Sequence, residues 1–103
     1  MDAKGIAARI KAELQGRWDI TNAHGVELRR CLVPPHRQEY LDGTSNQRVA
    51  LWTVLEELPD ALRGYKIVFD EASDSFGLGM RDNHANLIFL GVYGSFIDAL
   101  EAM

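Results

Sequence analysis

Three histidines and one cysteine are the side chains of this chain best suited to metal binding or covalent catalysis. His24, His36 and His84 all fall in segments rich in turn-forming residues, and none has a histidine or cysteine two or four positions away to complete a chelating pair. Cys31 lies in a predicted strand, where a small buried side chain is a more common role than a thiol nucleophile. We therefore predict no metal, no cofactor and no catalytic residue, and the chain shows no sign of being an enzyme.

An acidic run that includes Asp70, Glu71 and Asp74 suggests calcium, but the spacing is wrong. A calcium-binding loop of the EF-hand type needs oxygen ligands at alternating positions, and position 72 is alanine. The run Gly77-Leu78-Gly79 resembles the start of a dinucleotide-binding fingerprint, but Asp82 stands where the third glycine should be. We predict instead that these glycines let a helix or an aromatic ring pack against bare backbone.

The acidic residues gather in the second half of the chain. The whole chain has a net charge of −4; residues 1–48 carry eight Lys/Arg and six Asp/Glu, whereas residues 49–103 carry three Lys/Arg and nine Asp/Glu. A nucleic-acid-binding surface needs clustered Lys and Arg, so we exclude that class and expect a protein partner with a basic surface. The alternative is that the acidic residues only keep the domain soluble.

The predicted partner-binding surface is an acidic rim around a sheet that carries aromatic side chains. Two acidic pairs lie toward opposite ends of the predicted sheet, so they do not form a carboxylate dyad. In the alternative reading, the aromatic residues belong to the core and the acids are only solvated. The candidate residues are Glu56, Glu57, Asp60, Asp70, Glu71, Asp74, Trp52 and Tyr40.

The elements that must position these side chains follow from hydrophobic spacing. Residues 2–16 form a predicted amphipathic helix, with Ile6, Ile10 and Leu14 on one face and Gly16 as its stop. A loop at 18–25 leads to a predicted strand at 26–33, which Pro34 and Pro35 should end. Further predicted strands lie at 37–41, 49–58, 65–70, 76–80 and 87–93. For residues 49–58 a helix is the alternative.

Local signals also mark the last element, in which Ser95 and Asp98 resemble a capping box for a helix that buries Phe96, Ile97 and Leu100. We therefore predict a single α+β domain over residues 1–103. Its antiparallel sheet, a meander of about four to six strands, packs against an N-terminal and a C-terminal helix. No apolar run is long enough for a signal peptide or a membrane span, so we expect a cytoplasmic protein with no membrane contact.

A set of runs in the second half of the chain is familiar: 51–57, 64–71, 76–78 and 93–96, together with Leu100 and Met103. They resemble short uncharacterised bacterial proteins, some of which look like immunity proteins that neutralise a toxin. The resemblance implies an antiparallel sheet with flanking helices and a binding function, and it carries over no functional residue.

Three functional hypotheses follow. The first is a non-enzymatic binding protein, such as an immunity or inhibitor protein, that engages a basic partner through its acidic C-terminal half. The second is a small-ligand-binding protein or small enzyme with a pocket between sheet and helices that uses Tyr40, Trp52 or His36. The third is a homodimer formed through an exposed strand or an apolar sheet face.

Overall fold

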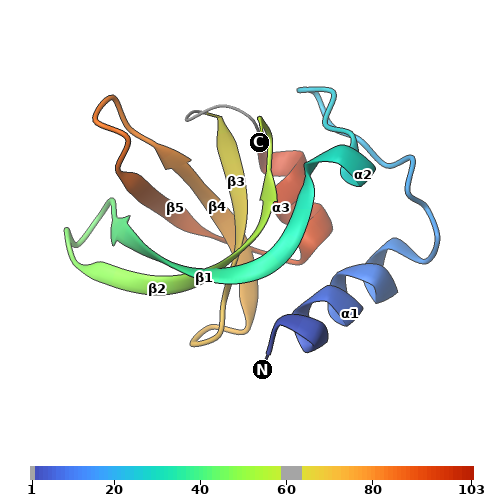
Figure 1. Ribbon diagram of the computed structural model, residues 1–103, viewed down its shortest axis with the longest axis horizontal. Coiled ribbons are helices and arrows are strands. Elements are labelled where there is room, and N and C mark those ends of the chain that lie inside the picture. Colours follow the sequence, from blue (N-terminus) through green and yellow to red (C-terminus); the bar gives the residue numbers. More distant parts are fainter. Residues whose placement is uncertain (1, 59–63) are drawn as a thin grey trace.

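A computed structural model describes residues 2–58 and 64–103 of the chain. It contains three helices and five strands, and the helices lie together on one side of the sheet (Figure 1). The helices are α1 (Ala3–Leu14), α2 (Leu28–Cys31) and α3 (Phe96–Ala102). The strands are β1 (Leu32–Asp42), β2 (Arg48–Glu56), β3 (Tyr65–Asp70), β4 (Ser75–Arg81) and β5 (Leu87–Gly94). The α+β class and the helices at both ends are as predicted.

The sheet closes into a five-stranded barrel, which the sequence did not predict. Consecutive strands pair antiparallel in the order β1-β2-β3-β4-β5, as in the expected meander. Because the number of strands is odd, the first and last strands run in the same direction, and closure requires a parallel pair. That pair is short: Leu41 lies beside Ile88 and Asp42 beside Phe89. The sheet is therefore mixed and not purely antiparallel.

The segment before the barrel corrects the predicted strand at 26–33. Residues 28–31 form one helical turn, α2, and the first strand begins only at Leu32. The two prolines lie inside β1 and do not end it, because the pairing jumps from Leu32–Leu55 to His36–Thr53 across a β-bulge. A bulge leaves residues outside the hydrogen-bonded ladder, so the missing N–H of proline is tolerated there. The predicted short strand at 37–41 is the end of this longer one.

The N-terminal helix forms as its sequence predicts. The Asp2 side chain accepts a hydrogen bond from the Gly5 amide at 2.9 Å and caps the helix. Ile6, Ile10 and Leu14 are all buried. The helix stops at Gln15, which takes the left-handed conformation one residue before the predicted glycine.

The C-terminal helix carries the predicted capping box in full. The Ser95 side chain accepts from the Asp98 amide, and the Asp98 side chain accepts from the Ser95 amide. Phe96 and Leu100 are buried, but Ile97 is only partly buried. Together with α1, this helix packs against the large core cluster that includes Phe69 and Phe76.

A second, smaller core cluster is formed by Tyr40, Leu51 and Val68. Tyr40 was predicted as a surface anchor for a partner, but it is 1% exposed and its hydroxyl lies 2.6 Å from the Thr53 hydroxyl. Burial raises the pKa of Tyr40 to about 12. A Cβ on Gly79 would lie 2.7 Å from the Tyr40 ring. The prediction that a glycine here lets an aromatic ring approach bare backbone is confirmed.

No helix in residues 2–58 and 64–103 is both long and apolar enough to cross a membrane.

Candidate functional site

The pairing of β2 with β3 separates the predicted acidic residues into two groups. Trp52 lies opposite Phe69, near the β3–β4 turn, whereas Glu56 lies opposite Lys66 at the other end of the ladder. The predicted separation of the two acidic pairs is therefore present. Asp60 lies outside the described residues.

The acids at the β3–β4 turn are neutralised within the molecule. The indole Nε1 of Trp52 donates a hydrogen bond to Glu71, and this bond holds the Glu71 pKa below its usual value. Arg37 lies over the Trp52 ring at 5.6 Å and reaches Glu71 at 3.4 Å. Arg9 of α1 forms an ion pair with Asp74 at 2.6 Å. These carboxylates hold α1 and β1 against the turn, so they are poorly placed to attract a basic partner.

Two more of the predicted residues also serve the fold. Asp70 accepts hydrogen bonds from the Ala72 amide and the Ser73 hydroxyl, both at 3.1 Å, and so shapes the β3–β4 turn. Glu56 forms an ion pair at 2.7 Å with Lys66, whose side chain is 2% exposed. A buried ammonium needs such a partner, so Glu56 is committed to Lys66.

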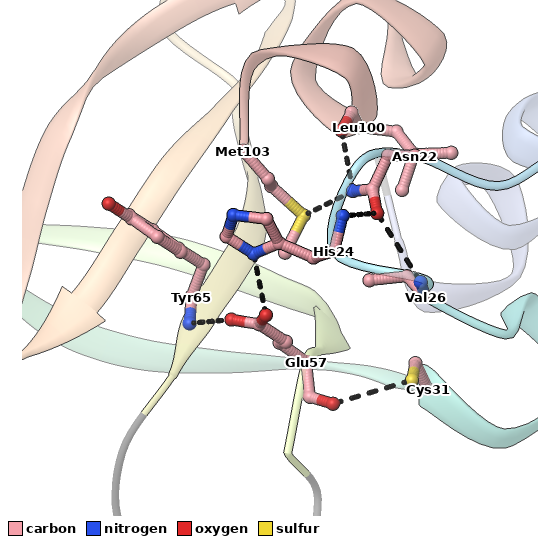
Figure 2. Close-up of polar contacts among 8 residues, drawn as sticks. All are labelled: Asn22, His24, Val26, Cys31, Glu57, Tyr65, Leu100 and Met103. Atoms are coloured by element: carbon pink, nitrogen blue, oxygen red, sulfur yellow. Dashed lines mark hydrogen bonds and ion pairs between the residues drawn. The ribbon is translucent and has the colours of Figure 1, made fainter.

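Glu57 lies at the centre of a polar cluster that sequence reasoning missed (Figure 2). One carboxylate oxygen is 2.6 Å from Nδ1 of His24, and the other accepts a hydrogen bond from the Tyr65 amide at 3.0 Å. The His24 and Tyr65 rings lie 5.7 Å apart between centroids. This carboxylate therefore orients the imidazole and leaves its Nε2 to form a hydrogen bond with a ligand.

The loop that carries His24 is fixed by Asn22. The Asn22 side-chain oxygen accepts from the amides of His24 and Val26 at 3.0 and 3.3 Å, and its amide donates to the Leu100 carbonyl at 2.8 Å (Figure 2). Asn22 thus ties the loop to α3 and sets the position of the imidazole. The sequence predicted a loop at 18–25, but nothing in the sequence indicated that this loop meets Glu57.

A cavity of about 230 Å³ lies beside His24 and Glu57, and its lining also includes Arg30 and Cys31. The Cys31 thiol donates to the Glu57 carbonyl at 3.5 Å. Burial raises the pKa of the Cys31 thiol, which disfavours the thiolate that a nucleophile needs. Within the described ranges, no three His, Cys, Asp or Glu side chains are placed to share a metal ion. The cavity is suited to a small polar ligand.

The three residues proposed as alternatives for a ligand pocket lie in different places. Tyr40 belongs to the small core cluster, whereas Trp52 packs against the large one. His36 is exposed, with Nδ1 3.0 Å from the Pro34 carbonyl. Any pocket that uses one of these side chains would therefore not include the other two.

Within the described residues, three of the four exposed large hydrophobic side chains lie on β5. Leu90, Val92 and Tyr93 are 40%, 46% and 47% exposed. The pairing of β4 with β5 passes from Phe89 to Gly91 and from Val92 to Gly94, so Leu90 and Tyr93 are the extra residues of two β-bulges. A bulge re-aims a side chain, which explains why three neighbouring apolar residues all face solvent. We call these three residues the β5 stripe.

Comparison with protein-family models, curated proteins and solved structures found no match to this chain.

Proposed function

We propose that this chain is a non-enzymatic binding protein, of the immunity or inhibitor type, that engages a basic protein partner through the β5 stripe. The supporting observation is that Leu90, Val92 and Tyr93 are all exposed within one short stretch of β5. Contiguous exposed apolar side chains mark interaction sites more often than scattered ones do. Tyrosine is among the residues that carry the most binding energy at such sites.

The charge around the stripe favours a basic partner. Residues 82–103 contain the acids Asp82, Asp98 and Glu101 and no Lys or Arg. Asp98 and Glu101 are exposed on α3, the helix that follows β5 directly. An apolar centre with a charged rim is the usual anatomy of a protein interface, and an acidic rim selects a basic counterpart. The acidic half of the chain is thus still the proposed binding half, but its contact residues move from the β3–β4 turn to β5 and α3.

The test is co-purification from the native host with tagged chains. The wild-type chain is compared with a Leu90→Ser, Tyr93→Ser double variant and with Leu58→Ser. Leu58 is 40% exposed, as Leu90 is, but it follows β2, so Leu58→Ser is the matched control. We expect one basic protein to be recovered with the wild type and with Leu58→Ser. Loss of one interface tyrosine typically weakens binding by roughly 30-fold, so the double variant should recover none.

Several outcomes would contradict the proposal. Recovery of an acidic partner, equal recovery with all three chains, or recovery of no specific partner would each do so. A dimer in light scattering that the double variant dissociates would assign the stripe to self-association instead. The double variant must keep the unfolding free energy of the wild type to within about 0.5 kcal/mol, since substitutions at exposed sites usually cost no more.

The His24–Glu57 cavity supports a second candidate function, the binding of a small polar ligand. The oriented imidazole beside a cavity of about 230 Å³ favours it. Screening a metabolite library by thermal shift would test it. A ligand of this site should stabilise the wild type and lose its effect in His24→Phe, while His84→Phe, in an exposed turn, should behave as the wild type.

A further inference from the structure

A cleft lined by β1, β2 and the β4–β5 turn brings two arginines from different strands together. It has a volume of about 350 Å³, and its lining includes Arg48 of β2, Arg81 at the end of β4, and Glu39 of β1. The β1–β2 turn contacts β5 in this part of the barrel, since the Gly43 amide donates to the Phe89 carbonyl at 3.1 Å. The lining therefore holds two guanidinium groups and one carboxylate in a protein whose net charge is −4.

One hydrogen bond holds the Arg81 side chain, but its Nε–H has no hydrogen-bond partner in the described part of the chain. Its Nη1 donates to the Ala85 carbonyl at 2.8 Å, across the β4–β5 turn. Its Nε is buried, and among the described residues it is the one buried side-chain nitrogen or oxygen without a hydrogen-bond partner. Buried donors are nearly always paired, so an orphan of this kind calls for an acceptor. The Nε–H and the neighbouring Nη2–H form the edge through which arginine takes a planar oxyanion with two hydrogen bonds.

Arg48 can supply a second cation to the same ligand. Its ion pair with Glu39 is 3.3 Å long, and the two side chains are 77% and 59% exposed. Exposed pairs of this kind contribute little, so the Arg48 guanidinium is free to turn toward the cleft. The partly buried side chains of Leu41 and Leu87 complete an apolar part of the lining, which suits a small organic body attached to the anionic group.

We propose that this cleft binds the oxyanion of a small ligand, a carboxylate or a phosphate, between Arg81 and Arg48. Bidentate contact with Arg81 requires its buried Nε to turn toward the cleft, and that movement would break the hydrogen bond from Nη1 to the Ala85 carbonyl. The site is independent of the β5 stripe, and it involves neither His24 nor Glu57.

The experiment uses inorganic phosphate and acetate as separate probes, each against sodium chloride at the same ionic strength. We expect phosphate, acetate or both to raise the melting temperature of the wild-type chain in a saturable way. The Nε–H signal of Arg81 in a ¹H–¹⁵N spectrum should shift with the same saturation. Arg81→Gln should weaken the apparent affinity by about tenfold or more, as expected for loss of a charge-assisted hydrogen bond, and Arg48→Gln by a smaller factor.

Arg17→Gln is the matched control, because Arg17 is exposed beyond α1 and its loss changes the net charge equally. Its affinity should equal that of the wild type. The proposal is overturned if neither probe acts beyond chloride, or if Arg81→Gln and Arg48→Gln behave as Arg17→Gln does. If Arg81→Gln does not fold, the proposal is tested by the apparent affinity of Arg48→Gln and by the shift of the Arg81 Nε–H signal in the wild-type chain. A response to phosphate alone assigns the ligand as a phosphate, and an equal response to acetate includes carboxylates.

Discussion

The β3–β4 turn and the β5–α3 surface (the β5 stripe with Asp98 and Glu101) are both acidic, but of the two, only the acids at the turn form ion pairs within the described residues. At the turn, Asp74 pairs with Arg9, and Glu71 takes hydrogen bonds from Trp52 and Arg37. On α3, Glu101 is exposed and has no basic residue near it in residues 82–103. The count of acidic residues in a sequence therefore gives the net charge of a chain, but the fold determines which of those charges remain unpaired and accessible to a partner.

The same contrast should appear in stability. Acids paired into the fold have partners whose removal is costly, whereas Glu101 and the apolar residues of the β5 stripe can be changed with little loss. Three substitutions test this difference on the paired side.

The largest effect is expected at Lys66. Lys66→Ala removes a side chain that is 2% exposed and leaves Glu56, 22% exposed, without its partner. Breaking a buried ion pair from one side costs about 3 kcal/mol or more. Urea unfolding monitored by tryptophan fluorescence measures it. Lys4→Ala, on the exposed face of α1, is the control, and an equal loss in both variants would show that the Lys66–Glu56 pair is no more important than a surface charge.

A smaller loss is expected at Arg9. Its guanidinium pairs with Asp74 and also lies 5.3 Å and 5.6 Å from the centres of the Phe69 and Phe76 rings. The ion pair is partly exposed and contributes little, but the cation–π contacts add to it, so Arg9→Ala should cost about 1 kcal/mol. The same urea titration applies. A loss of unfolding free energy near zero would mean that the charges at the β3–β4 turn contribute no more to stability than those of the β5–α3 surface, which would contradict the contrast.

The smallest effect is expected in the pH dependence of Trp52→Phe. The hydrogen bond from Trp52 keeps the pKa of Glu71 low in the folded state. The ionised form therefore stabilises the fold above the ordinary glutamate pKa of about 4.3, and this contribution is lost as the pH falls through the lowered value. In Trp52→Phe the Glu71 pKa should rise toward its ordinary value. An NMR titration of the Glu71 side chain gives both values directly, and an unchanged pKa would contradict the assignment.

Local signals predicted the elements that are defined by neighbours in sequence. The Ile6, Ile10 and Leu14 spacing gave α1, and Ser95 with Asp98 gave the start of α3. The hairpins were predicted from short apolar runs separated by turn formers. The strand predicted at 26–33 was wrong because Leu28 and Cys31 are buried on one face of a helical turn. A short run of apolar residues fits a strand or a helix equally well.

The candidate site could not be predicted, because it depends on pairing between distant positions. Arg9 and Asp74 are 65 residues apart, and His24 and Glu57 are 33 apart. None of these four residues lies in a distinctive sequence motif. The exposure of Leu90 and Tyr93 depends on two register shifts against β4, and hydrophobic alternation alone would have placed one of every two such residues in the core.

The short parallel seam between β1 and β5 has a consequence for how the chain folds. Each antiparallel ladder joins strands that are neighbours in sequence, so each can form early by closing a small loop. The seam joins residues 41 and 42 to 88 and 89, and it can form only when all four ladders already hold the two ends of the sheet together. We expect it to be the last contact to form in folding and the first to open, with the amide protons of these residues exchanging ahead of those in β3.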